Sequence, residues 1–338
     1  NRETTNYGGD KFDADSELSL TASISWELDL WGNLRWARDR STAEFLASVE
    51  NCRAVKMGLV AQVAQSYFEL MALDNELAIV RRTLEARREG VRLAEIRFKG
   101  GLTSEIVFQQ AKVELAKTAT MVPDLERRIS LKESEIALLT GDFPYAVNRN
   151  ILPEEIQLPN ALPLGLPSTL LERRPDIRKA ERELMAAHAE VGLAYTNMFP
   201  RLALTATLGT ESETLRDFLK SPYSYLAGNL LSPLFAMGKN RAALKAKRAA
   251  YEGAVAEYEQ TVLTAFKETH DAIINFNKIK DIYESRRQLA EASRTAVELA
   301  QLQYINGVIG YLDLLDAQRN YFDAQVSLSN AVCNKQLM

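Results

Sequence analysis

The placement of proline constrains this chain more than any other feature of its sequence. All ten prolines lie between Pro123 and Pro233, so residues 1–122 and 234–338 contain none. Because proline breaks the interior of an α-helix, both of these flanks are free to form very long helices. The pattern predicts a helix over residues 35–99, which would be on the order of 100 Å long. No compact globular domain of this size contains a helix of that length.

The apolar residues of the helical segments repeat at steps of three and four. In the second flank they do so from Tyr251 to Tyr304, and a shorter segment that starts at Pro175 follows the same steps. This heptad spacing requires a partner helix, and the many alanines along the seam permit a close approach. Taken alone, the helices are as consistent with a soluble coiled coil as with any other helical assembly.

The two flanks are copies of one pattern. A constant offset aligns them without a gap, so that Gly32 corresponds to Gly238. Each copy predicts a long helix, a glycine turn and a returning helix, because glycine or asparagine just past a helix end supplies the left-handed cap. Ser104 or Gly310 could then cap the next helix. The predicted hairpin tips are residues 100–104 and 306–310, with Gly101, Leu102, Thr103 and Ser104 in the first and Gly307, Val308, Ile309 and Gly310 in the second.

Three short segments alternate between apolar and polar residues, which predicts β-strands. The alternation is complete over residues 17–30, and further strands are expected at 202–208 and, more weakly, at 225–235. A membrane strand needs about 9–11 residues, which the first segment exceeds. A soluble sheet with one wet face is the simpler explanation, but three isolated strands leave both sheet edges unpaired. A barrel closed by several copies removes those edges, and its lipid-facing side would carry Leu18, Leu20, Ala22, Ile24, Trp26, Leu28 and Leu30.

Composition argues against several other classes of function. The 41 basic and 45 acidic residues give a formal net charge of −4, which offers no surface for nucleic acid. Two cysteines and two histidines argue against a disulfide scaffold or a histidine-rich metal centre. The sequence has no nucleophile–base–acid set and no phosphate-binding glycine loop, so no enzyme, cofactor or metal site is expected. No uncharged apolar run reaches 18 residues, so no transmembrane helix is expected either.

Two motifs resemble those of a known family. One is the run PLGLPSTLLERRPDIRKAE at residues 163–181, followed by Met-Phe-Pro at 198–200, and the other is GVIGYLDLLDAQR at residues 307–319. Both are similar to motifs of TolC-like outer-membrane efflux channels, and within that family to the lipoprotein branch associated with multidrug exporters. The first motif is specific and the second moderately so, and the resemblance spans about the whole chain.

The resemblance implies a protein that is mainly α-helical with membrane β-strands. Three protomers would form a trimeric α-helical barrel of long coiled-coil hairpins, continuous with a twelve-stranded β-barrel to which each protomer contributes four strands. This chain would supply three of the four, so it is expected to be a fragment that lacks the N-terminal part. The family implies an outer-membrane protein of a Gram-negative bacterium that extends into the periplasm and acts as a passive exit duct for small molecules.

The resemblance also implies the partners. They are two further copies of the chain, outer-membrane lipid, a periplasmic adaptor (membrane fusion) protein at the hairpin tips, and an inner-membrane efflux pump of the resistance-nodulation-division type. The alternative from another class is a soluble coiled-coil scaffold or periplasmic adaptor, which would pack the leucines of the first strand inside a soluble sheet.

The expected segments are a strand with its preceding loop (1–32), the first periplasmic hairpin (33–140), an equatorial linker (141–174), a helix (175–199), an outer-membrane β-hairpin (200–237) with an extracellular loop at 209–223, and the second periplasmic hairpin (238–338).

Asp313 and Asp316 are the most informative polar residues. Spaced by three, they share one face of the first turns after the second tip, where carboxylates stabilise a helix N-terminus. In a threefold assembly each acid would instead become a ring of three that binds cations at the narrow end of the duct. The resemblance implies a closed periplasmic gate formed by these acids with Arg319 and Tyr311. The first tip has Val107 at the position equivalent to Asp313, so the second hairpin is expected to carry most of the constriction.

Overall fold

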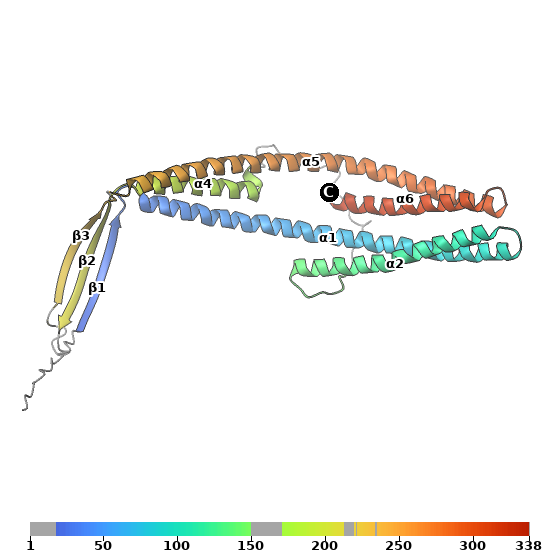
Figure 1. The fold of residues 1–338 in the computed structure, drawn as a ribbon, viewed down its shortest axis with the longest axis horizontal. Helices are drawn as coiled ribbons and strands as arrows, with labels where there is room; N and C mark the ends of the chain where they lie inside the picture. Colours follow the sequence, from blue (N-terminus) through green and yellow to red (C-terminus); the bar gives the residue numbers. More distant parts are fainter. Residues whose placement is uncertain (1–17, 150–170, 213–219, 221, 234, 338) are drawn as a thin grey trace, which may run out of the picture. The chain divides into compact units, whose positions relative to one another are not determined.

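The computed structural model describes residues 18–149, 171–212, 220, 222–233 and 235–337. Its mainly α-helical fold with a few β-strands confirms the fold class predicted from the sequence. Figure 1 labels the elements, which are β1 (Leu18–Leu28), α1 (Asn33–Lys99), α2 (Glu105–Thr140), α4 (Pro175–Thr196), β2 (Arg201–Ser212), β3 (Pro222–Leu231), α5 (Met237–Ile305) and α6 (Tyr311–Leu337).

The chain divides into two compact units. The first comprises residues 1–50 and 177–260, and the second comprises residues 51–176 and 261–338. Some of the predicted features lie outside the described residues: the loop before the first strand, the greater part of the linker, and the first residues of the run at 163–181.

The first unit contains a three-stranded antiparallel sheet in the order β1-β2-β3. β1 ends at Leu28, two residues before the predicted end, because the Leu30 N–H closes a tight turn by donating to the Leu28 carbonyl at 2.9 Å. β2 extends to Ser212 because its last residues pair with the start of β1. Both ends of the predicted loop at 209–223 belong to strands, because β3 begins at Pro222, and the rest of that segment lies outside the described residues except for position 220.

The register of the sheet places apolar residues of all three strands on one face. Ile24 pairs with Ala206, which pairs in turn with Leu226. Ile24 is 76% exposed and Leu226 is 75% exposed, so no other described element covers this face. Of the side chains predicted there, Leu30 follows the strand, and the side chain of Leu18 lies outside the described part. The remaining five share the face: Leu20, Ala22, Ile24, Trp26 and Leu28.

The opposite face of the sheet carries hydroxyl groups. The Ser25 and Thr205 hydroxyl oxygens lie 3.2 Å apart, and those of Thr21 and Tyr223 lie 3.1 Å apart. The Tyr223 ring covers Gly209, where an added Cβ would lie 2.5 Å from the ring. Because successive side chains of a strand point to opposite faces, the alternating sequence produces one apolar and one hydroxyl-bearing face.

The helices of the first unit approach each other closely at Gly192 of α4. A Cβ at this position would collide with the indole ring of Trp36 from α1, so only glycine permits the contact. Beside it, the His188 ring lies between Trp36 and Tyr251 of α5, with a centroid distance of 5.6 Å on each side. The structure therefore assigns His188 to interhelical packing.

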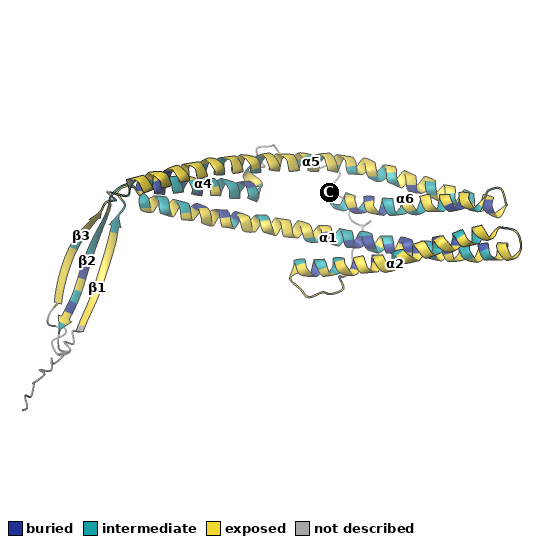
Figure 2. Cartoon of the chain, viewed as in Figure 1, coloured by how far each residue is buried: buried dark blue, intermediate teal, exposed yellow. Residues whose placement is uncertain are grey.

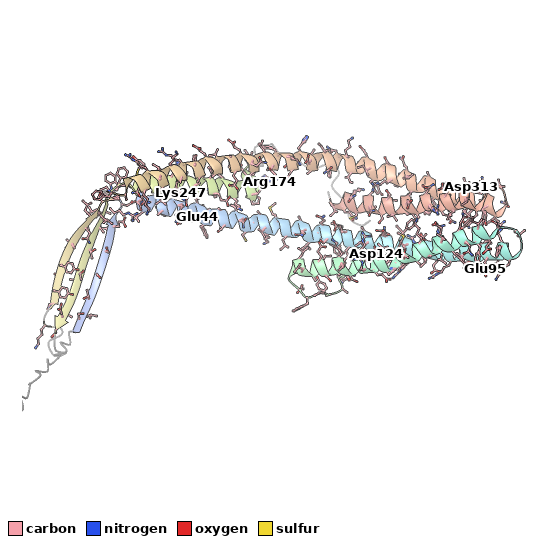
Figure 3. The ribbon with its side chains drawn as sticks, viewed as in Figure 1. Glu44, Glu95, Asp124, Arg174, Lys247 and Asp313 are labelled. Atoms are coloured by element: carbon pink, nitrogen blue, oxygen red, sulfur yellow. The ribbon has the colours of Figure 1, made fainter. Side chains whose placement is uncertain are left out.

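Polar contacts fix the ends of these helices. Asp29, which follows β1, accepts hydrogen bonds from the backbone N–H groups of Leu34 at 2.9 Å and Arg35 at 3.1 Å, which satisfies two donors at the start of α1. Lys247 of α5, labelled in Figure 3, pairs with Glu190 of α4 at 2.6 Å. Asp29 thus caps the start of α1, and the pair of Lys247 with Glu190 joins α5 to α4.

The second unit contains two helical hairpins. The later part of α1 returns as α2, and the later part of α5 returns as α6. Pro123 lies inside α2, which continues past it. An apolar cluster at α1 and α2, with Phe322 of α6 packed against it, forms the core: Leu70, Leu73, Leu77, Val80, Leu125, Ile129, Ile136 and Val147.

The described end of the sequence motif at residues 163–181 forms ion pairs that join the start of α4 to α5. Arg174, labelled in Figure 3, lies 2.7 Å from Asp176 and 2.5 Å from Glu268 of α5. The hydrogen bond with Asp176, reinforced by Glu268, raises the pKa of the Arg174 guanidinium above its ordinary value. This part of the motif therefore has a structural role.

Much of the surface of the long helices α1 and α5 is exposed, as Figure 2 shows, whereas α4 is mostly of intermediate exposure. On α1 the exposed side chains include large apolar ones, with Phe45 64%, Val55 62% and Val60 62% exposed. Apolar residues along one helix surface indicate a face that a partner covers. No described helix has a stretch long and apolar enough to cross a membrane.

Candidate functional site

The two hairpin turns of the second unit have the same backbone geometry. Gly101 and Gly307 adopt left-handed φ angles of 72° and 74°, which favour glycine. In the first turn the Leu102 N–H donates to the Arg97 carbonyl at 2.8 Å, and in the second Val308 donates equivalently to Gln303 at 2.9 Å. These bonds satisfy carbonyls at the helix ends, so each turn reverses the chain within a few residues.

The side chains at the turns differ from one hairpin to the other. Leu102 and Val308 project at both tips and are 74% and 71% exposed. Ser104 makes no side-chain capping bond at the start of α2. At the start of α6, by contrast, Asp313 accepts a hydrogen bond from the Gly310 N–H at 3.0 Å. Asp313, labelled in Figure 3, therefore caps its own helix, the simpler of the two roles considered for it.

The ion-pair partner of Arg319 within the described chain is Glu114 of α2. The Arg319 guanidinium lies in direct contact with one Glu114 oxygen. Asp316 instead accepts a hydrogen bond from Asn320 one turn further along α6, at 3.2 Å. The hydrogen bond from Arg319 holds the pKa of the Glu114 carboxyl below its ordinary value. The contact joins the first hairpin to the second.

Arg87 of α1 is a second guanidinium group beside Glu114. Its side chain is 7% exposed, its Nη1 donates to Gln318 of α6 at 2.5 Å, and its Nη2 lies 3.9 Å from Glu114. Burial lowers the pKa of the Arg87 guanidinium, and the Glu114 carboxylate acts in the opposite direction. Glu114 is thus shared between two guanidinium groups, and we call Arg87, Glu114, Gln318 and Arg319 the interhairpin clasp.

Aromatic contacts extend the interhairpin clasp toward the tips. The guanidinium of Arg97 lies 4.6 Å from the centre of the Tyr304 ring, which places a cation over an aromatic face. The Tyr304 and Tyr311 rings lie 5.8 Å apart. Tyr311 is half-buried, and this burial raises the pKa of its hydroxyl. Of the four residues predicted for the gate, Arg319 belongs to the clasp and Tyr311 lies beside it, while Asp313 and Asp316 are exposed.

Sequence reasoning missed Glu114, Arg87 and Gln318. A usable signal exists for Glu114, because it lies three residues after Ala111 and four before Thr118 on the buried face of α2. A carboxylate in an apolar stripe indicates a buried cation nearby, since unpaired buried charges are strongly unfavourable. No comparable pattern identifies Arg87, because its partners lie on two other helices.

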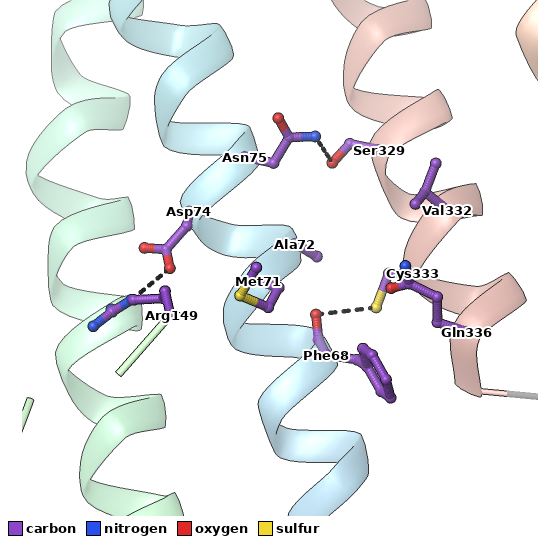
Figure 4. A pocket seen from close by; sticks show the side chains of 10 residues that line it. All are labelled: Phe68, Met71, Ala72, Asp74, Asn75, Arg149, Ser329, Val332, Cys333 and Gln336. Atoms are coloured by element: carbon purple, nitrogen blue, oxygen red, sulfur yellow. Dashed lines mark hydrogen bonds and ion pairs between the residues drawn. The ribbon is translucent and has the colours of Figure 1, made fainter. Parts of the chain in front are cut away.

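A second set of contacts joins α6 to α1 near the end of the described chain. A cavity of about 540 Å³ lies between them, and Figure 4 shows its lining. Asn75 donates to the Ser329 hydroxyl at 2.8 Å, and the Cys333 thiol donates to the Phe68 carbonyl at 3.4 Å. Burial raises the pKa of the Cys333 thiol.

The described residues contain no group of three His, Cys, Asp or Glu side chains that could hold a metal ion. The interhairpin clasp consists of charged and amide groups whose contacts can form and break without covalent chemistry. Such an arrangement can hold two hairpins together and release them when α6 moves.

Comparisons with known proteins identify relatives across nearly the whole chain. Residues 1–142 and 166–336 match the family described as "Outer membrane efflux protein". Outer membrane protein OprJ of Pseudomonas aeruginosa is 34% identical over 322 residues, which cover 92% of this chain and 66% of OprJ. The solvent efflux pump outer membrane protein SrpC of Pseudomonas putida is 32% identical over 320 residues, covering 94% of this chain and 68% of SrpC. The chain therefore spans about two thirds of the length of these curated relatives.

A solved structure has the same fold. The crystal structure of a membrane protein from Pseudomonas aeruginosa superposes with a TM-score of 0.85 at 28% sequence identity. The superposition covers 95% of this chain and 82% of the other. Both the strands and the helical hairpins described above therefore have counterparts in a known membrane protein.

Proposed function

We propose, because this chain belongs to the outer membrane efflux protein family, that it forms part of a passive exit duct across the outer membrane. The family consists of efflux proteins rather than enzymes. The protein would conduct small molecules from an inner-membrane pump to the exterior, without supplying energy and without making or breaking bonds.

One observation carries this proposal: the sheet exposes an apolar face and a hydroxyl-bearing face at once. A membrane offers lipid to the first and a water-filled pore to the second, whereas in water the apolar face would favour aggregation. The exposure of Ile24 and Leu226, each about three quarters, supports a lipid contact at Leu20, Ala22, Ile24, Trp26 and Leu28. A soluble scaffold or adaptor would need to cover this face.

We further propose a homotrimer. Among the described strands, β1 and β3 each pair on one side only, and further copies would pair the remaining edges. The exposed apolar residues of α1, including Phe45 and Val55, would then pack against a neighbouring protomer. Three copies would give the trimeric α-helical barrel and the twelve-stranded β-barrel that the resemblance implies.

The proposed partners are a periplasmic adaptor at the tips and an inner-membrane pump, of the resistance-nodulation-division type. The exposed Leu102 and Val308 support an apolar docking contact at both tips, residues 100–104 and 306–310. SrpC is named as an outer membrane protein of a solvent efflux pump, which supports a pump partner for this chain as well.

We propose that the second hairpin is the moving part of a periplasmic gate. In the closed state the interhairpin clasp would hold α6 against α2, and three copies of Asp316 would line the narrow end of the duct. Opening would move α6 outward and separate Arg319 from Glu114. The Asp316→Ala variant should raise the closed-state conductance of the protein in planar bilayers. Asn320→Ala, which removes only the hydrogen-bond donor to Asp316, is the control, and unchanged conductance in Asp316→Ala would contradict the gate.

Two neighbouring positions test the membrane orientation of the sheet. In a Cys52→Ser background, Ser23→Cys and Ile24→Cys place thiols on opposite faces of β1. In liposomes containing the full-length protein, a charged, water-soluble thiol reagent should modify position 23 rapidly and position 24 at least about tenfold more slowly, because hydrocarbon excludes charge. Equal rates at both positions would contradict the proposed duct.

A further inference from the structure

The second unit contains a cavity where α1, α5 and α6 meet, lined by both apolar and polar side chains. Its volume is about 300 Å³, and its lining includes two arginines, three glutamines, a threonine and a tyrosine but no carboxylate. Since a water molecule in the liquid occupies about 30 Å³, the cavity has room for several waters or for a small polyatomic ligand. The polar side chains that line it include Arg82, Arg87, Gln318, Tyr321 and Gln325.

Arg87 contributes a buried positive charge that is incompletely satisfied. Its guanidinium uses Nη1 on Gln318, while its Nε has no hydrogen-bond partner among the described residues. The nearby carboxylate of Glu114 is shared with Arg319. Two guanidinium groups therefore share one carboxylate, and an unmet N–H donor of a buried cation is unfavourable unless an acceptor is supplied.

The other polar groups of the cavity also have donors to offer. The Tyr321 hydroxyl accepts a hydrogen bond from the Gln325 amide at 2.9 Å, which leaves its own O–H to donate. The Gln318 carbonyl oxygen accepts from Arg87, which leaves the amide N–H groups of Gln318 as donors. Arg82, exposed at the rim, donates only from Nε, to the Ala78 carbonyl at 3.4 Å. Several N–H and O–H donors therefore remain beside two guanidinium groups and no carboxylate, a composition that favours an anion.

We propose that this cavity binds a small oxyanion, such as inorganic phosphate or a small carboxylate. Arg82 and Arg87 would supply the charge, and Tyr321 and Gln318 would supply neutral donors. An oxyanion fits better than a halide, because its several oxygens can accept from donors on α1 and α6 at once. Glu114 supplies one negative charge to Arg87 and Arg319 together, and the bound anion would supply a second.

A bound oxyanion would connect α1 to α6 beside the interhairpin clasp. If α6 moves when the duct opens, the anion would stabilise the closed state. This regulatory consequence rests on the proposed function, whereas the binding itself does not, so the two are tested by separate measurements.

Equilibrium dialysis of radiolabelled inorganic phosphate against the full-length protein in detergent tests the binding. Saturable binding of about one phosphate per protomer is expected. Arg82→Gln should weaken it about tenfold or more, as expected for one charge-assisted hydrogen bond. Tyr321→Phe, which keeps the ring, should weaken it several-fold. The matched control is Arg88→Gln, which removes the same charge from an exposed residue of the same helix that pairs with Glu85.

Two results would overturn the proposal: no saturable binding to the unmodified protein, or an equal loss in Arg88→Gln and Arg82→Gln. Competition by acetate would support a site open to carboxylates, and its failure would support one for phosphate. Conductance in planar bilayers then tests the consequence, because phosphate should lower it in the unmodified protein and not in Arg82→Gln. If phosphate binds without lowering the conductance, only the coupling of binding to the gate is contradicted, and the binding proposal stands.

Discussion

The two hairpins of the second unit share a backbone and differ in their chemistry. Gly101 and Gly307 adopt nearly the same φ, and both turns close with the same backbone hydrogen bonds. Acids in the first turns of both returning helices are exposed, Glu105 in α2 and Asp313 in α6, but only the first hairpin also buries an acid further along, since Glu114 is 5% exposed. The repeat therefore conserves the chain reversal through one glycine per turn and leaves the neighbouring side chains free to take different roles.

The hairpins also differ in how they are packed. The first contains most of the apolar core of its unit, through α1 and α2. In the second, the later part of α5 buries few side chains, among them Ala265, Ala290 and Tyr304. A helix with few buried contacts separates from its neighbours more readily, so this difference applies to α5, because α6 buries Leu314, Leu315, Ala324, Ser329, Ala331 and Cys333.

The largest effect is expected from removing the acid that joins the hairpins. Glu114→Leu leaves the buried Arg87 without a carboxylate, and breaking a buried ion pair in this way costs about 3 kcal/mol. The free energy of unfolding, measured with urea in detergent, should fall by about that amount. The matched control is Glu126→Leu, which breaks a surface pair with Arg81 at 2.7 Å and should cost less than about 1 kcal/mol. Equal costs would show that Glu114 contributes no more than a surface acid.

The next effect tests whether the two turns are equivalent. Gly101→Ala and Gly307→Ala should each lower the free energy of unfolding by about 1–2 kcal/mol, because an alanine is strained at a left-handed φ. An added Cβ would meet no neighbour at either position, so the two costs should be equal. Gly253→Ala, inside α5 and equally unobstructed, should instead stabilise the protein. Unequal costs at the two turns would contradict the shared geometry.

A smaller effect is expected from exchanging the caps of the returning helices. Asp313→Ala removes the acceptor of the Gly310 N–H and should cost about 0.5–1 kcal/mol. Amide hydrogen exchange at Gly310 should accelerate correspondingly. Val107→Asp places a carboxylate at the equivalent position of α2 and should slow exchange at Ser104. If Val107→Asp does not slow amide exchange at Ser104, the difference between the caps of α2 and α6 depends on more than the residue at this position.

The smallest effect is a dependence on pH. Because the Arg319 hydrogen bond lowers the folded-state pKa of Glu114, its contribution is complete above the unfolded-state value of about 4.3. The contribution is then lost as the pH falls through the lowered folded-state pKa. Unfolding measured from pH 7 down to pH 3 should show this loss in the unmodified protein. Glu114→Gln should lose less stability in acid, and an identical profile would exclude Glu114 as a source of the acid dependence.

Much of the fold could be predicted because it depends on local rules. Helix α1 ends at Lys99 and α2 begins at Glu105 because glycine provides the left-handed turn between them, and this is readable from the chain. The alternation in β1 likewise placed its side chains on the correct faces. The end of β1 was two residues off, since the tight turn at Leu30 interrupts a pattern that continues in the sequence.

The candidate site was only partly predictable. The Gly310 N–H donates to Asp313, only three residues further along the chain. A capping role for Asp313 could therefore be predicted from the sequence alone. The partner of Arg319 lies more than 200 residues away on α2, and its identity depends on how the two hairpins pack. Neither residue periodicity nor the internal repeat determines that packing, so Glu114 was not among the residues predicted for the gate.

The contact at Gly192 limits how the first unit can vary. The indole of Trp36 occupies the place where alanine at position 192 would put its Cβ. The close spacing of α1 and α4 therefore depends on glycine, which has only a hydrogen atom there. Alanine there would force the two helices apart or turn the indole away from His188. A larger residue at position 192 would therefore preserve the present helix spacing only together with a smaller ring at position 36.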